Sequence, residues 1–159
     1  MAMHTWFECK IRYEKVMENG MQKKVTEPYL VDALSFTEAE ARIIEEMTPF
    51  ISGEFTVSDI KRANYSELFP SDEESADRWF KCKLIFITLD EKSGAEKKTS
   101  TQVLVQAADL RDAVKKLDEG IKGTMADYQI GMVSETPLMD VYPYSAEPND
   151  KPEFDPSKA

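Results

Sequence analysis

Apolar and polar residues alternate along two segments of the chain that begin with the same motif. TWFECKIRYEK carries apolar side chains at every second position from Phe7 to Tyr13, and RWFKCKLIFIT does so from Phe80 to Phe86. A period of two with one polar side is typical of an antiparallel strand that is buried on one face. Asn19-Gly20 and Ser93-Gly94 are turn signals, so each segment predicts a β-hairpin.

A helical spacing of apolar residues follows each predicted hairpin and places one apolar stripe on each helix, suited to lie on a sheet. Thr37 and Glu40 have the spacing of a capping box, and Asp109 is suited to cap the second helix. The stripes consist of Ala39, Ile43 and Met47 in the first helix and of Ala113, Leu117 and Ile121 in the second.

The two halves of the chain match well beyond the shared motif WFxCK. After the helices, Phe69-Pro70 in the first half corresponds to Tyr142-Pro143 in the second. Agreement over this length predicts an internal duplication, in which each copy contains two strands, a helix, a strand and a short strand. We therefore expect an α+β fold of two ββαββ units, each an antiparallel sheet with one packed helix, related by a pseudo-two-fold axis around a shared core.

The length of 159 residues suits one compact domain built from both copies. The first repeat is assigned to residues 5–70, a polar, acidic linker to residues 71–77 and the second repeat to residues 78–143. Residues 144–159 place prolines among acidic residues and are expected to form an acidic tail without ordered structure. Such a tail is either simply solvated, or it docks partners or masks a basic site.

The net charge of −10 argues against a strong, indiscriminate binder of polyanions. Acidic residues concentrate between Asp32 and Asp77 and in the tail, whereas the predicted hairpins are close to neutral. No apolar run reaches the roughly 20 residues of a membrane span, and the start MAMHTWFECK lacks the pattern of a secretion signal. We expect a cytoplasmic protein with no membrane partner.

Residue types that usually carry catalysis or hold metals are scarce. His4 is the one histidine, and Cys9 and Cys82 fall on the apolar side of their strands, where a free thiol behaves as a small hydrophobe. A metal site would need further cysteine or histidine ligands, and no glycine-rich phosphate loop is present. We therefore expect a non-enzymatic protein with no catalytic residue, no metal and no cofactor.

The two tryptophans are candidate binding residues. If Phe7 and Phe80 face the core, strand alternation turns Trp6 and Trp79 outward beside basic residues. Such an arrangement resembles a platform on which bases stack while cations contact phosphates. The candidate nucleic-acid-binding residues are Trp6, Lys10, Arg12, Lys23, Lys24, Trp79, Lys81, Lys83, Lys97 and Lys98.

The same residues allow a second interpretation. Trp6 and Trp79 are equally suited to be covered by the rest of the chain or by a partner subunit, and Ile85 and Ile87 favour an apolar contact. Two functions therefore stay open. One is a sequence-tolerant binder of single-stranded nucleic acid, with access modulated by the acidic tail. The other is a protein-interaction or assembly module, forming a homo-oligomer, in which the tryptophan face is a subunit interface.

The segments WFECKIRYEK, KKVTEPYLVDALSFTEAEARIIEEM and GEFTVSDIKRANYSELFP resemble a small family of uncharacterised proteins from gut bacteria and their phages, known as a domain of unknown function. The resemblance covers residues 5–70 and continues to about residue 143. It implies no activity and no catalytic residues, and occurrence in phages implies a replication or recombination accessory. The order of four strands and a helix is also similar to the Whirly and PUR single-strand-binding folds, a likeness of fold order alone.

Overall fold

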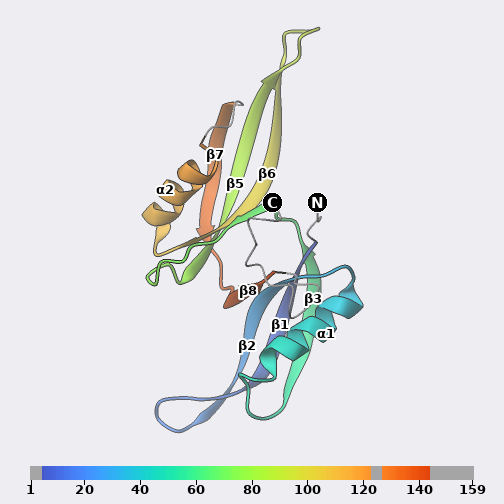
Figure 1. Ribbon diagram of the computed structural model, residues 1–159, viewed down its shortest axis with the longest axis vertical. Coiled ribbons are helices and arrows are strands. Elements are labelled where there is room, and N and C mark those ends of the chain that lie inside the picture. The colour runs from blue at the N-terminus through green and yellow to red at the C-terminus, as the bar shows by residue number, and fades with distance from the viewer. Residues whose placement is uncertain (1–4, 123–126, 144–159) are drawn as a thin grey trace, which may run out of the picture. The chain divides into compact units, whose positions relative to one another are not determined.

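Eight strands and two helices form two compact units in the computed structural model, which describes residues 5–122 and 127–143 (Figure 1). The first unit holds the described residues up to Ala63 together with those from Asp140 onward. The second unit runs from Asn64 to Met139. The expected α+β class is confirmed.

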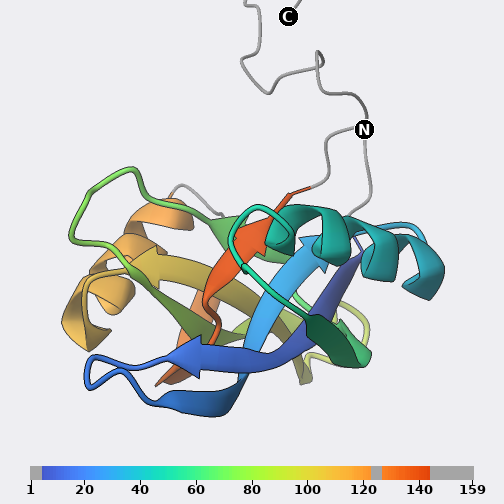
Figure 2. The ribbon, with the colours of Figure 1, turned by 90° about the horizontal axis from the view of Figure 1, so that it is seen from below.

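In the first unit, a helix covers one face of a four-stranded sheet (Figure 2). Strands β1 (Trp6–Val16) and β2 (Gln22–Asp32) form an antiparallel hairpin, and α1 (Phe36–Met47) then leads to β3 (Phe55–Ala63). The order is β3-β1-β2-β8, where β8 spans Asp140–Tyr142. The core under the helix consists of Phe7, Cys9, Ile11, Val31, Ala33, Ala39, Ile43 and Met47.

The second unit repeats this arrangement. Strands β5 (Arg78–Leu89) and β6 (Glu96–Ala107) form its hairpin, which extends beyond the end of β7 (Asp127–Glu135) (Figure 1). Helix α2 (Leu110–Gly120) packs on the sheet, whose order is β4-β6-β5-β7, with β4 at Glu67–Phe69. Both predicted hairpin turns are confirmed, because Gly20 and Gly94 adopt φ values of 83° and 71° that favour glycine.

The short strands pair differently from the prediction of two self-contained antiparallel sheets. β4 follows β3 in the sequence but pairs parallel with β6, and β8 follows β7 but pairs parallel with β2. The connection of residues 64–66 explains the first case. It spans at most roughly 14 Å, whereas the far edge of its own sheet lies three strand spacings away, also roughly 14 Å, which leaves no slack for turning.

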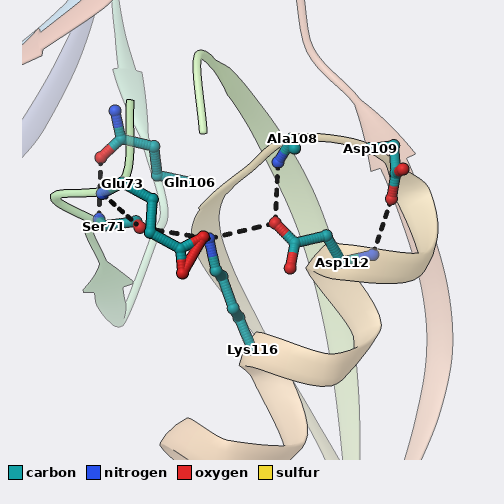
Figure 3. A network of polar contacts seen from close by, with 7 residues as sticks. All are labelled: Ser71, Glu73, Gln106, Ala108, Asp109, Asp112 and Lys116. Atoms are coloured by element: carbon teal, nitrogen blue, oxygen red, sulfur yellow. Dashed lines mark hydrogen bonds and ion pairs between the residues drawn. The ribbon is translucent and has the colours of Figure 1, made fainter. Parts of the chain in front are cut away.

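Residues 71–77, expected to be a linker, are attached to the second unit by polar contacts (Figure 3). The backbone N–H of Ser71 donates to Gln106 Oε1 at 2.9 Å. Lys116 Nζ donates to Ser71 Oγ at 3.1 Å and to Glu73 Oε1 at 3.2 Å, and it forms an ion pair with Asp112 Oδ2 at 3.0 Å. Ser71 and Glu73 of this segment are therefore held against the second unit by α2 and β6.

The structure confirms the predicted cap of α2 and corrects the predicted cap of α1. Asp109 Oδ1 accepts from the backbone N–H of Asp112 at 2.8 Å, as expected for an N-cap. In α1 the N-cap is Ser35, not Thr37, since Ser35 Oγ accepts from the N–H of Glu38 at 3.1 Å. The Glu38 carboxylate in turn accepts from the N–H of Leu34 at 2.8 Å. Ser35 and Glu38 have the same spacing as Thr37 and Glu40. The helix begins at Phe36, so the earlier pair forms the cap.

Asp112 is expected to make the second unit sensitive to acid. The pKa of Asp112 lies below its usual value, mainly because the Ala108 N–H donates a hydrogen bond to the carboxylate and also because Lys116 donates one. Stabilisation by the carboxylate is thus present above the unfolded pKa of about 3.9 and is lost as the pH falls through the lower folded pKa. Asp112→Asn keeps an acceptor for Ala108 but removes the charge. Its urea midpoint should therefore fall less steeply than that of the wild type from about pH 5 to about pH 3. Glu91→Gln, in the exposed turn, serves as the control, and equal slopes for Asp112→Asn and wild type would contradict the prediction.

Candidate interaction site in the first unit

Both tryptophans are buried, which favours the interpretation that they are covered over that of an exposed stacking platform. Trp6 is 5% exposed and Trp79 is 6% exposed. Strand alternation does turn them away from the helices, but that face is itself covered at this end of each sheet. Leu30 and Leu104 lie on the same faces as Trp6 and Trp79 and are fully buried. Alternation decides which face a side chain takes and not whether the face is covered. Neither tryptophan presents a ring on which a base stacks.

Within each unit, the basic candidate residues are divided between the two faces of the sheet. Within each Lys-Lys pair, neighbouring residues take opposite faces of the strand, so only one of the two joins the other candidates. Strand register places Lys10, Arg12 and Lys24 on the face of the first sheet away from α1, Lys81, Lys83 and Lys98 on the matching face of the second sheet, and Lys23 and Lys97 on the helix sides.

An open hollow of about 920 Å³ lies at the end of the first sheet, between the hairpin and the loop that leads from α1 to β3. Arg12 and Lys24 are the two predicted binding residues that line it. Residues 50–56, which are the loop after α1 and the start of β3, form the opposite wall. The structure thus brings together a small part of the predicted set, and neither tryptophan is among the residues that line the hollow.

Positive charge prevails slightly in the hollow although the chain as a whole is acidic. Its cationic side chains are Arg12, Lys15 and Lys24, and its carboxylates are Glu14 and Glu54. Lys15 Nζ lies 3.5 Å from Glu27 Oε2. Arg12 and Lys24 form no ion pair within the part of the chain that the structure describes. Two cations are therefore available to an incoming group.

Large apolar side chains are exposed at the same end of the unit. Phe50 and Val16 line the hollow and are 76% and 64% exposed. Met17 and Met21 lie in the adjoining hairpin turn and are 39% and 66% exposed. In the matching turn region of the second unit, described residues 88–97, only Leu89 is a large exposed apolar residue. We name Val16, Met17, Met21 and Phe50 the apolar end of the first unit.

A polar network fixes the strand that forms one wall of the hollow. Glu27 Oε1 accepts hydrogen bonds from Tyr13 OH at 2.8 Å and from Tyr29 OH at 3.4 Å. Burial, and then the Glu27 carboxylate, raise the pKa of Tyr13 to about 12, so this hydroxyl stays a donor at neutral pH. Tyr29 also stacks on Tyr142 of β8, with ring centroids 6.1 Å apart. The wall is therefore held in place by the hairpin and the added strand together.

Sequence reasoning missed the apolar end. The signal was present in the turn MENGMQ, where Met17 and Met21 flank a segment that ordinarily contains polar residues. Phe50 gave no signal by itself, because a phenylalanine soon after a helix is as often buried as exposed. Its 76% exposure is decided by the course of the loop that follows α1.

The cysteines are buried and unpaired, as expected. Burial raises the pKa of Cys9 to about 12 and that of Cys82 to about 11, so both stay protonated at neutral pH. His4 lies outside the described residues. Within those residues, no group of three or more His, Cys, Asp or Glu side chains is placed to hold a metal ion. No helix in the same part of the chain has the length and apolar character to cross a membrane.

A family model described as a domain of unknown function, DUF4494, matches residues 5–144. No curated protein and no solved structure matches the chain. The resemblance to an uncharacterised family is thereby confirmed. Occurrence in gut bacteria and phages and the likeness to Whirly and PUR folds stay predictions.

Proposed function

We propose that this chain, which belongs to the DUF4494 family, is a non-enzymatic assembly module that binds a second copy of itself through the apolar end of the first unit. The observation that carries the proposal is the exposure of Phe50, Val16 and the two methionines beside one hollow. Contiguous exposed apolar side chains are typical of interaction sites, and aromatic residues, methionine and arginine are enriched there.

The charges around the hollow suit a second copy as the partner. Most soluble oligomers are symmetric homo-oligomers, and a two-fold contact sets the same patch against itself. Such a patch needs both charge signs. Arg12 and Lys24 supply cations, and Glu14 and Glu54 supply carboxylates in the same hollow. The buried tryptophans have no place in this interface, which moves the contact from the predicted tryptophan face to the end of the hairpin.

We also infer that the two units arose by internal duplication and that the first copy alone kept the interaction surface. The shared strand order supports this inference, as does the register shift that follows Lys10 where β1 pairs with β3 and Lys83 where β5 pairs with β7. After a duplication, one copy is free to lose a surface while its fold persists. Such a loss agrees with the second unit, where Leu89 is the only large exposed apolar residue of the described turn region 88–97.

Single-stranded nucleic acid is a second candidate ligand for the same hollow. Phe50 offers an exposed ring for base stacking, while Arg12 and Lys24 offer cations to phosphates. The net charge of −10 weighs against it. The loss of the tryptophan platform weighs against it as well, so we place it second.

Sedimentation of the full chain over a range of concentrations tests the proposal. We expect reversible dimerisation that changes little between roughly 50 and 500 mM salt, because an apolar contact is screened less than an ionic one. Phe50→Ser should weaken the dimer at least about tenfold, as for a central aromatic anchor. Leu89→Ser, which removes a similarly exposed apolar residue at the end of β5 in the second unit, should leave it unchanged.

A chain that stays monomeric at all concentrations would sink the assembly proposal. The competing candidate is read from the anisotropy of a labelled oligothymidine strand at the same salt concentrations. Saturable binding that weakens steeply with salt and is lost in the double variant Arg12→Glu, Lys24→Glu would favour nucleic acid instead.

A further inference from the structure

We propose that the segment Glu153-Phe154-Asp155 of the same chain docks into the hollow of the first unit and masks the apolar end. Phe154 would pack on Phe50, and the flanking carboxylates would approach Arg12 and Lys24. The inference rests on the same site as the proposed function, but it concerns how the site is occupied before a partner arrives.

Chemical complementarity favours this segment as the occupant. Within residues 144–159, Phe154 is the aromatic residue that has a carboxylate on each side. The hollow offers the counterpart, an exposed phenylalanine beside two cations that form no ion pair among the described residues. Glu14 and Glu54 also line the hollow, so the contact depends on Arg12 and Lys24 and should fail when their charge is reversed.

The chain is long enough to reach the hollow. β8 holds Tyr142 beside Val31, and the carbonyl of Pro143 accepts from Arg42 Nη2 at 3.0 Å, which fixes where the tail departs. From Val31 back to Lys24 along β2 is roughly 23 Å at 3.3 Å per residue. The roughly ten residues from Pro143 to Glu153 span up to about 35 Å when extended. The difference leaves room for the reversal that the direction of β8 requires.

Tethering makes even a weak contact effective. A segment joined to its site by a short stretch of the same chain acts at an effective concentration in the millimolar range. A second copy at micromolar concentration must then compete with it. We therefore expect the tail to restrain self-association, and Phe154→Ser should strengthen the dimer severalfold.

Paramagnetic relaxation in the full chain tests the docking directly. The variant Ser157→Cys carries a nitroxide label, which attaches selectively at neutral pH because Cys9 and Cys82 are buried and protonated. The amide resonances of Lys24 and Gly53 should lose more than half of their intensity, and those of the turn at residues 90–95 should keep it. Arg12→Glu with Lys24→Glu should restore the lost intensity. The matched pair Lys83→Glu with Lys98→Glu, in the second hairpin, should not.

Two results would overturn the inference. One is no loss of intensity at Lys24 and Gly53, or an equal loss in both hairpins. The other is a loss of the same size when labelled chains are mixed with separate isotope-enriched chains, which would place the tail on a second copy. Sedimentation reports on the proposed function independently. A dimer without tail docking leaves the assembly proposal intact, and tail docking in a monomer leaves the masking contact intact.

Discussion

Replacing Trp79 by alanine is expected to lower the free energy of unfolding by about 3–5 kcal/mol, the usual cost of deleting a large aromatic side chain from a packed interior. The ring is 6% exposed, and Leu104 on the same face of the sheet is fully buried. Alanine would leave a cavity that a strand backbone cannot collapse to fill. Trp6→Ala should have a comparable effect through the first unit, where Trp6 is 5% exposed.

Denaturant unfolding followed by far-ultraviolet circular dichroism measures this effect. Phe50→Ala provides the matched control, since it also deletes an aromatic ring but one that is 76% exposed. We expect that variant to change the free energy of unfolding by no more than about 0.5 kcal/mol. If Trp79→Ala lowered the free energy of unfolding as little as Phe50→Ala, the Trp79 ring would have to face solvent. That result would reopen the base-stacking hypothesis.

Shortening Phe69 should loosen the sheet of the second unit, although the sequence places Phe69 in the first repeat. Phe69 is half-buried against the core of the second unit, and its ring lies over Gly120 of α2. Phe69→Ala is expected to cost about 2–3 kcal/mol, less than a fully buried ring because part of the side chain is already in water. Tyr142→Ala should act in the same way on the first unit, where Tyr142 packs against the core and stacks on Tyr29.

Amide hydrogen exchange separates the two units and makes each variant the control for the other. Phe69→Ala should speed exchange along β6 and leave β2 protected, and Tyr142→Ala should do the reverse. If Phe69→Ala instead sped amide exchange along β2, β4 would pair within the first repeat, and the short strands would belong to the sheets of their own repeats. The sheets would then be self-contained, as the duplicated sequence pattern alone predicts.

Local features of the fold could be predicted from the sequence because their causes lie within a few residues. The alternation from Phe7 to Tyr13 and the turn at Asn19-Gly20 define a hairpin without help from distant residues. The helical stripes and the Asp109 cap are equally local. The buried, protonated state of Cys9 follows from its place in the apolar alternation.

Tertiary structure alone decided the features on which function depends. Alternation assigned Trp6 and Trp79 to a face of a strand, but burial depends on what covers that face, and no local pattern encodes it. The pairing of β4 with β6 and of β8 with β2 was set by the reach of the connections and by long-range packing. Phe50 came to line the same hollow as Arg12 through the course of a loop. Periodicity reports how each residue is oriented on its own element, whereas a binding surface arises where elements distant in the sequence meet.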